Sequence, residues 1–92
     1  MPLSESPCSQ NSQTTVLIVD DDASIIMLLE EFLSMEGYKS ITAGSAEEAL
    51  KLVGNHKIEI AILDLKLPQM SGIDLLKILR ESQPHIDAVM LT

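Results

Sequence analysis

Hydrophobic residues follow two alternating patterns along the chain, short apolar runs and longer stretches with helical spacing. The runs at 15–19 and 58–63 are apolar at most positions, which is typical of strands buried on both faces of a parallel sheet. A run with weaker patterning at 38–43 and an apolar run at 88–92 have the length and composition of further strands. The pattern therefore predicts a sheet built from these runs.

The segments between successive runs carry apolar residues at helical spacing, which predicts amphipathic helices at 23–36, 45–54 and 73–82. Asp22 or Ser24 can cap the first helix, and Gly37 stands where the end of a helix favours left-handed backbone. Ser45 and Glu48 match a capping box at the start of the second helix. Strands that alternate with helices predict an α/β fold with right-handed crossovers and a parallel sheet covered by helices on both faces.

The chain divides into a short leader and one small domain. Residues 1–14 are rich in Ser, Gln, Asn and Pro and contain little to bury, so we expect a disordered leader there. The domain occupies 15–92. Its last predicted strand reaches Thr92 without a turn or a polar tail, so we expect the chain to be a fragment or a truncated gene product.

Charge and composition narrow the possible classes of function. The chain has 92 residues and a net charge of −8, which argues against direct binding of nucleic acid or of an anionic membrane surface. No apolar run approaches the roughly 18 residues of a membrane span, and no secretory signal is visible, so we expect a cytoplasmic protein. Cys8 is the only cysteine, which excludes an internal disulfide and a metal site built from cysteines.

Acidic residues follow two of the predicted strands at the point where each strand ends. Asp20, Asp21 and Asp22 come after the first strand, and Asp64 comes after the third. Ligands of open parallel α/β sheets bind outside the carboxyl ends of the strands. If the first and third strands are neighbours, about 4.8 Å apart, Asp20, Asp21 and Asp64 converge, and Thr92 at the end of the fourth strand can face them. Carboxylates with waters and backbone carbonyls suit Mg²⁺.

A carboxylate beside Mg²⁺ can attack a phosphoryl donor and form an aspartyl phosphate. Asp64 is the better acceptor, because it stands alone on its strand and precedes a loop that modification could rearrange. The hydroxyl of Thr92 can donate a hydrogen bond to a phosphate oxygen. Asp22 is expected to be only a turn residue or a helix cap, and the side chain of Lys66 a solvated loop residue.

Three segments together resemble the receiver domain of bacterial two-component response regulators. They are VLIVDDD at 16–22, ILDLKLPQMSG at 62–72 and VMLT at 89–92. The spacing between Asp20 and Asp64 is also similar to that family. The resemblance covers everything except the leader.

This resemblance implies a flavodoxin-like doubly wound parallel sheet with strand order 2-1-3-4, lacking the fifth strand and last two helices of the family. It implies that Asp64 accepts a phosphoryl group from a sensor histidine kinase or a phosphotransfer protein. Asp21, Asp64 and the backbone carbonyl of Lys66 would bind Mg²⁺ directly, and Asp20 largely through water. Thr92 would contact the phosphoryl group and couple it to a conformational switch. Such a domain is a signalling switch, not an enzyme.

The missing elements leave other functions open. The family's lysine at the end of the fifth strand and the surface toward an output domain have no counterpart in the sequence, and the fourth strand should be an exposed edge. The chain could therefore be a non-phosphorylated interaction module, with any output domain downstream. A third reading takes Asp20 as the nucleophile of a Mg²⁺-dependent phosphohydrolase with an Asp-x-Asp motif, which leaves Asp64 without a role.

Overall fold

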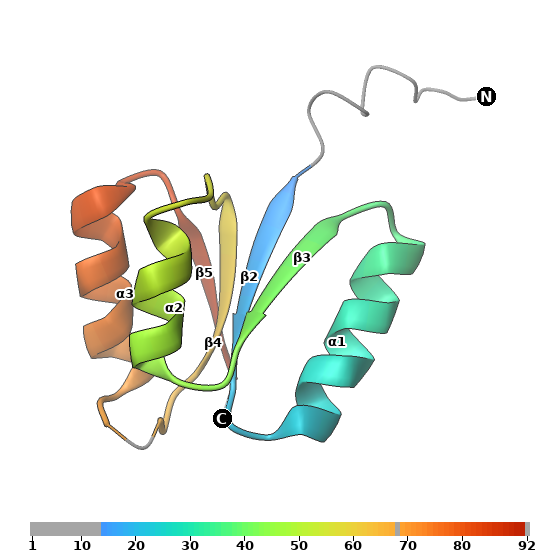
Figure 1. Cartoon of the computed structure of the whole chain (residues 1–92), viewed down its shortest axis with the longest axis horizontal. Coiled ribbons are helices and arrows are strands. Elements are labelled where there is room, and N and C mark those ends of the chain that lie inside the picture. The colour runs from blue at the N-terminus through green and yellow to red at the C-terminus, as the bar shows by residue number, and fades with distance from the viewer. Residues whose placement is uncertain (1–13, 68, 92) are drawn as a thin grey trace.

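The computed structural model describes residues 14–67 and 69–91, and it is an alternating α/β fold (Figure 1). In chain order the elements are β2 (Thr15–Val19), α1 (Ala23–Met35), β3 (Lys39–Ala43), α2 (Ala46–Val53), β4 (Ile60–Asp64), α3 (Gly72–Ser82) and β5 (Asp87–Leu91). Each element lies within two residues of its predicted bounds. The predicted leader, apart from residue 14, and Thr92, the predicted switch residue, lie outside the described residues.

The four strands of the described residues are all parallel, and their order in the sheet is β3-β2-β4-β5. This is the 2-1-3-4 order expected from the sequence. The largest departure from the predicted bounds is at the start of β4, because Ile58 precedes this strand instead of belonging to it. Its amide donates a hydrogen bond to the side-chain oxygen of Gln83, at 2.7 Å, and so is not available to a neighbouring strand.

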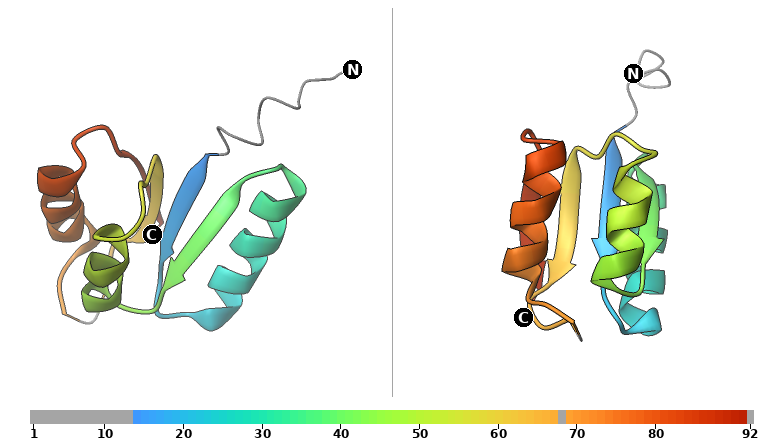
Figure 2. Two further views of the ribbon diagram at one scale, coloured as in Figure 1. Left: turned by 45° about the horizontal axis from the view of Figure 1, so that its top comes forward. Right: turned by 60° about the vertical axis from the view of Figure 1, so that its left-hand side comes forward.

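Helices cover both faces of the sheet, with α1 on one side and α2 and α3 on the other (Figure 2). The side chains of β2 alternate between these two layers, as the period of a strand requires. Leu17 and Val19 join the larger core beneath α2 and α3. Val16 and Ile18 join a smaller core beneath α1, together with Leu33. Both faces of β2 are therefore buried, as its continuous apolar run predicts.

The helix α1 buries less of its apolar stripe than its sequence suggests. Leu33 is 8% exposed, whereas Leu28, Phe32 and Met35 are 64%, 56% and 75% exposed. Within the described residues α1 is the only helix on its face of the sheet, so it has no neighbouring helix to pack against. At the edge of the sheet, Val89 of β5 is likewise 51% exposed, as expected for an edge strand.

The predicted caps position the turns at both ends of the helices. The side chain of Asp22, not that of Ser24, caps α1 by accepting a hydrogen bond from the Ser24 amide at 2.9 Å. Gly37 follows α1 with a φ of +87°, the left-handed backbone expected there. The hydroxyl of Ser45 accepts a hydrogen bond from the Glu48 amide at 3.2 Å, which confirms the cap of α2. Among the described residues, no helix has the length and apolar character needed to span a bilayer.

A single glutamine side chain ties together two connections at the end of the sheet opposite the acidic residues. The side-chain oxygen of Gln83 accepts the Ile58 amide, and its nitrogen donates to the carbonyls of His56 at 2.8 Å and Val53 at 3.1 Å. These bonds join the end of α3 to the last residue of α2 and to the segment between α2 and β4. Because the glutamine is partly buried, their loss would leave main-chain groups without partners in a place that water reaches poorly.

We expect Gln83→Ala to lower the free energy of unfolding by about 2 to 3 kcal/mol, because each lost hydrogen bond contributes about 1 kcal/mol net. Urea denaturation measures the change. Gln69→Ala is the matched control, since Gln69 is exposed in the loop after β4. A loss no larger than that of the control would contradict this account of Gln83.

Candidate metal site

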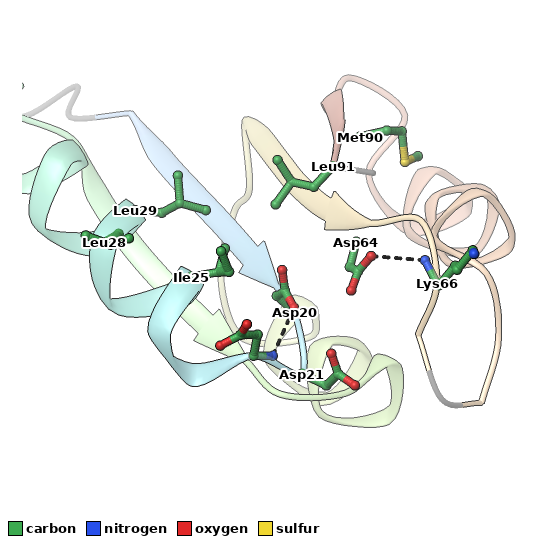
Figure 3. A pocket seen from close by; sticks show the side chains of 10 residues that line it. Asp20, Asp21, Ile25, Leu28, Leu29, Asp64, Lys66, Met90 and Leu91 are labelled. Atoms are coloured by element: carbon green, nitrogen blue, oxygen red, sulfur yellow. Dashed lines mark hydrogen bonds between the residues drawn. The ribbon is translucent and has the colours of Figure 1, made fainter.

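The register between β2 and β4 brings acidic residues together at one edge of the sheet. Val19 pairs with Leu63, so the strands end side by side and Asp20 lies next to Asp64. Asp20, Asp21 and Asp64 each offer a carboxylate oxygen, and these oxygens all lie within 4.8 Å of one another. Figure 3 shows the carboxylates of Asp20 and Asp64 at the ends of adjacent strands. The convergence predicted from the sequence is therefore present.

Asp20 is the buried member of the group, with 5% of its surface exposed. Its amide donates a hydrogen bond to the carbonyl of Ala43 at 3.2 Å, which extends the pairing with β3 by one residue. Its carboxylate accepts a hydrogen bond from the Asp22 amide at 2.9 Å, so the turn into α1 holds the side chain in place. Asp21 and Asp22 are exposed in that turn.

Asp64 is half-buried at the end of β4, and the backbone that follows it is fixed on both sides. One of its carboxylate oxygens accepts a hydrogen bond from the Lys66 amide at 3.1 Å. The Leu65 amide donates to the carbonyl of Leu91 at 3.0 Å, which ties this backbone to the end of β5. On the other side, the Leu65 carbonyl accepts a hydrogen bond from the Gly72 amide at 3.0 Å.

The cluster bears an electrostatic cost. Burial raises the pKa of Asp20 above its usual value, and the charges of Asp64 and Asp21 raise it further. The hydrogen bond from the Asp22 amide opposes this rise by favouring the charged form. The net increase in the pKa means that the folded chain holds the Asp20 carboxylate ionised at a cost, which a bound cation would offset.

The carboxylates form one wall of a cavity of about 780 Å³. The other wall is apolar, and its residues come from α1 and from the end of β5 (Figure 3). They are Ile25, Leu28, Leu29, Met90 and Leu91. Sequence reasoning assigned the α1 residues to the core and missed this wall, because helical spacing alone does not reveal which part of a stripe stays uncovered.

The remaining candidate residues are placed as follows. Asp22 caps α1, as predicted, and also lines the cavity. Lys66 is exposed and lies at the rim, so its side chain is solvated as expected. Leu91 lines the cavity, and Thr92, which follows it in the sequence, lies outside the described residues. The carboxylates of Asp20, Asp21 and Asp64 offer oxygen ligands, which suit a hard cation such as Mg²⁺.

A family model described as the response regulator receiver domain matches residues 16–92. The chain belongs to this family. Among curated receiver-containing proteins, the heme response regulator HssR of Staphylococcus saprophyticus is 42% identical over 79 residues, covering 86% of this chain and 35% of that protein. The alkaline phosphatase synthesis transcriptional regulatory protein PhoP of Bacillus subtilis is 42% identical over 77 residues, covering 84% and 32%. The chain thus spans about a third of the length of these relatives.

Solved receiver domains have the same fold. A CheY-like receiver domain protein from Methanospirillum hungatei is 35% identical with a TM-score of 0.81, covering 85% of this chain and 62% of that one. TrrA of Thermotoga maritima, solved in complex with Mg²⁺ and BeF, is 35% identical with a TM-score of 0.79, covering 87% and 70%. A response regulator from Burkholderia pseudomallei with a phosphorylated aspartic acid, a calcium ion and citrate is 34% identical with a TM-score of 0.81, covering 87% and 47%. The flavodoxin-like fold of this receiver domain is therefore confirmed.

Removing the charge of Asp20 should stabilise the receiver domain when no divalent cation is present. We expect Asp20→Asn to raise the free energy of unfolding at neutral pH by at least about 1 kcal/mol, the energy of two like charges about 4 Å apart in water. Because the pKa of Asp20 is raised in the folded chain, the gain should disappear as the pH falls below its usual value of 3.8, where both states hold the proton.

Urea denaturation across this pH range measures the effect. The amide oxygen of asparagine can still accept the Asp22 hydrogen bond, so the substitution changes charge more than geometry. The matched control is Asp22→Asn, which exchanges one good helix cap for another and should change stability by less than about 0.5 kcal/mol. A destabilised Asp20→Asn variant at neutral pH would refute the electrostatic cost.

Proposed function

We propose that this receiver domain is a phosphoacceptor in two-component signalling, with Asp64 as the residue that is phosphorylated. The donor would be a phosphohistidine on a sensor histidine kinase or on a phosphotransfer protein. The observation that carries the proposal is the cluster of Asp20, Asp21 and Asp64, whose carboxylate oxygens lie within 4.8 Å of one another at the carboxyl ends of β2 and β4. Membership of the receiver family supports it.

Exposure and hydrogen bonding favour Asp64 over its two neighbours. Asp20 is 5% exposed, so a donor as large as phosphohistidine has little access to its oxygens. Asp21 lies in the turn before α1, where it is solvated. Asp64 is half-buried in the cavity wall, and the Lys66 amide donates a hydrogen bond to one of its oxygens. The other oxygen would attack phosphorus.

The reaction transfers the phosphoryl group between two side chains. The attacking oxygen of Asp64 forms a bond to phosphorus as the phosphorus–nitrogen bond of phosphohistidine breaks, and the electron pair of that bond stays on the imidazole nitrogen. The hydrogen bond from the Lys66 amide holds the carboxylate during the transfer. Catalysis of this kind depends on positioning and on compensation of negative charge, because the protein has little covalent chemistry to supply.

The acidic cluster would hold Mg²⁺. In the arrangement we propose, Asp21, Asp64 and the backbone carbonyl of Lys66 are direct ligands, and Asp20 acts mainly through water. When bound, Mg²⁺ supplies positive charge that compensates the carboxylates and the transferred phosphoryl group. The raised pKa of Asp20 supports this, because burial and then the charges of Asp64 and Asp21 disfavour the ionised carboxylate, and a cation would compensate both. The complex of TrrA with Mg²⁺ and BeF supports it by similarity.

The response would pass from Asp64 to β5. The Leu65 amide donates to the carbonyl of Leu91, so the residue after the acceptor is already bonded to the residue before Thr92. We infer that Thr92 contacts the phosphoryl group and that its movement shifts the end of β5. On this proposal the chain is a cytoplasmic switch without turnover of its own.

Any DNA-binding output would belong to a longer protein and not to this domain. The relative PhoP is named as a transcriptional regulatory protein, and this chain matches only 32% of its length. The net charge of −8 opposes direct contact between this domain and nucleic acid. The proposed partners of the domain itself are therefore the kinase or phosphotransfer protein and such an output domain.

Phosphorylation of Asp64 is tested with radiolabelled acetyl phosphate and Mg²⁺. We expect the protein to take up label that is lost in both acid and alkali. Asp64→Ala should reduce this labelling to background, because the nucleophile is gone. Asp74→Ala, which changes an exposed acid on α3, should leave the labelling rate unchanged.

Two results would favour the alternative functions, an interaction module or a phosphohydrolase. If the unchanged protein takes up no label, the chain is an interaction module that keeps the fold without the switch. If Asp20→Ala abolishes phosphatase turnover and Asp64→Ala has no effect, the chain is a phosphohydrolase.

A further inference from the structure

The glycine that begins α3, Gly72, packs against the main chain of Asp64 and Leu65. Gly72 is buried, and its amide donates a hydrogen bond to the Leu65 carbonyl at 3.0 Å. A Cβ atom added at Gly72 would collide with the main-chain carbonyl oxygen of Asp64, and it would lie 3.3 Å from the Cα of Leu65. The first turn of α3 can approach the end of β4 this closely only because residue 72 has no side chain.

The approach is specific to this glycine. At Gly54 an added Cβ would meet its nearest neighbour, the carbonyl oxygen of Lys51, at an ordinary 3.6 Å, and the backbone there is right-handed helical. At Gly37 an added Cβ would meet nothing within 4 Å, and the positive φ alone requires glycine. Only at Gly72 would an added Cβ come closer than an ordinary contact, and the atoms it would meet there are main chain, which cannot turn aside as a flexible side chain can.

The contact bears on the part of the chain that carries the acceptor. The peptide between Asp64 and Leu65 lies between Gly72 on one side and Leu91 of β5 on the other, and each side supplies a hydrogen-bond partner to Leu65. An antiparallel bridge between Lys66 and Ser71 closes the loop from β4 to α3. The backbone of residues 64–66 therefore has little freedom to move, and the direction of the Asp64 carboxylate is set with it.

We propose that Gly72 is a positioning residue for phosphoryl transfer. It allows α3 to press against the end of β4 and so aims the Asp64 carboxylate at the oxygens of Asp20 and Asp21. The proposal rests on the proposed function of Asp64. A side chain at Gly72 would push the Asp64 carboxylate away from those of Asp20 and Asp21. A misplacement of about 1 Å lowers the rate of a positioned reaction by about a hundredfold.

The test compares Gly72→Ala with two control variants and the unchanged protein. Gly54→Ala adds the same methyl group where space allows it. Ser71→Ala removes the hydroxyl that caps α3 by accepting the Asp74 amide, which costs about 1 kcal/mol without adding any atom behind Asp64. A stabilising osmolyte in every sample keeps the variants folded. Each protein is assayed for urea unfolding and for the rate of labelling by acetyl phosphate as a function of Mg²⁺ concentration.

We expect Gly72→Ala to label about 10- to 100-fold more slowly when folded and to need more Mg²⁺ for half of its maximal rate. Gly54→Ala and Ser71→Ala, measured in their folded states, should label at the rate of the unchanged protein. An unchanged rate and Mg²⁺ dependence in Gly72→Ala would overturn the proposal. A Gly72→Ala chain that stays unfolded in the osmolyte would overturn it too, because the role of Gly72 would then lie in the fold and not in the site.

A structural measurement separates this inference from the proposed function. If the unchanged protein takes up no label, the phosphoacceptor function fails by itself. The crystal structure of Gly72→Ala then decides the positioning role. Displacement of the Asp64 main chain away from Asp20 supports it, and an unmoved Asp64 contradicts it.

Discussion

The parallel pairing of β2 with β4 is the constraint on which the rest of the structure depends. Because Val19 pairs with Leu63, the acidic residues that follow the two strands must share one edge of the sheet. Both faces of β2 are buried, so a slip of register would disrupt two cores at once. The sheet therefore holds Asp20 and Asp64 together although their charges oppose it.

The surroundings of the cluster keep this unfavourable arrangement in place. The turn into α1 supplies the amide of Asp22 to Asp20, and the loop after β4 supplies the amide of Lys66 to Asp64. Gly72 brings the start of α3 against the same loop. These contacts orient the carboxylates without neutralising them, which leaves the negative charge for a cation to compensate. The repulsion between these carboxylates lowers stability at this end of the sheet. Such unfavourable local arrangements are often found at binding sites.

The sequence predicted the fold well because its signals were local and agreed with one another. Continuous apolar runs identified β2 and β4, helical spacing identified the three helices, and Gly37 ended α1 with the left-handed backbone expected of it. The convergence of the acids followed from strand order alone. The bond from Gln83 that keeps Ile58 out of β4 could not be predicted, since it joins residues far apart in the chain.

Other features depend on which surfaces meet in three dimensions. Two examples are the exposure of Leu28 on α1 and the close approach of Gly72 to Asp64. The spacing of residues along the chain does not show which elements pack against each other. The resemblance of three short motifs to the receiver family was confirmed by the match over residues 16–92. The roles of Asp64 as acceptor, of Asp20 and Asp21 at the metal, and of Thr92 and the Lys66 carbonyl stay predictions.

The central claim is that the carboxyl ends of β2 and β4 bind Mg²⁺ and a phosphoryl group. Amide NMR spectra test this claim most directly. The isotope-labelled protein is titrated with Mg²⁺ and then with beryllofluoride, which has the tetrahedral geometry of a phosphoryl group. We expect the largest shifts at 20–22 and 64–66, and we expect the beryllofluoride effect to be lost in Asp64→Ala. If the largest shifts instead occur at the other end of the strands, around His56 and Gln83, the claim is wrong.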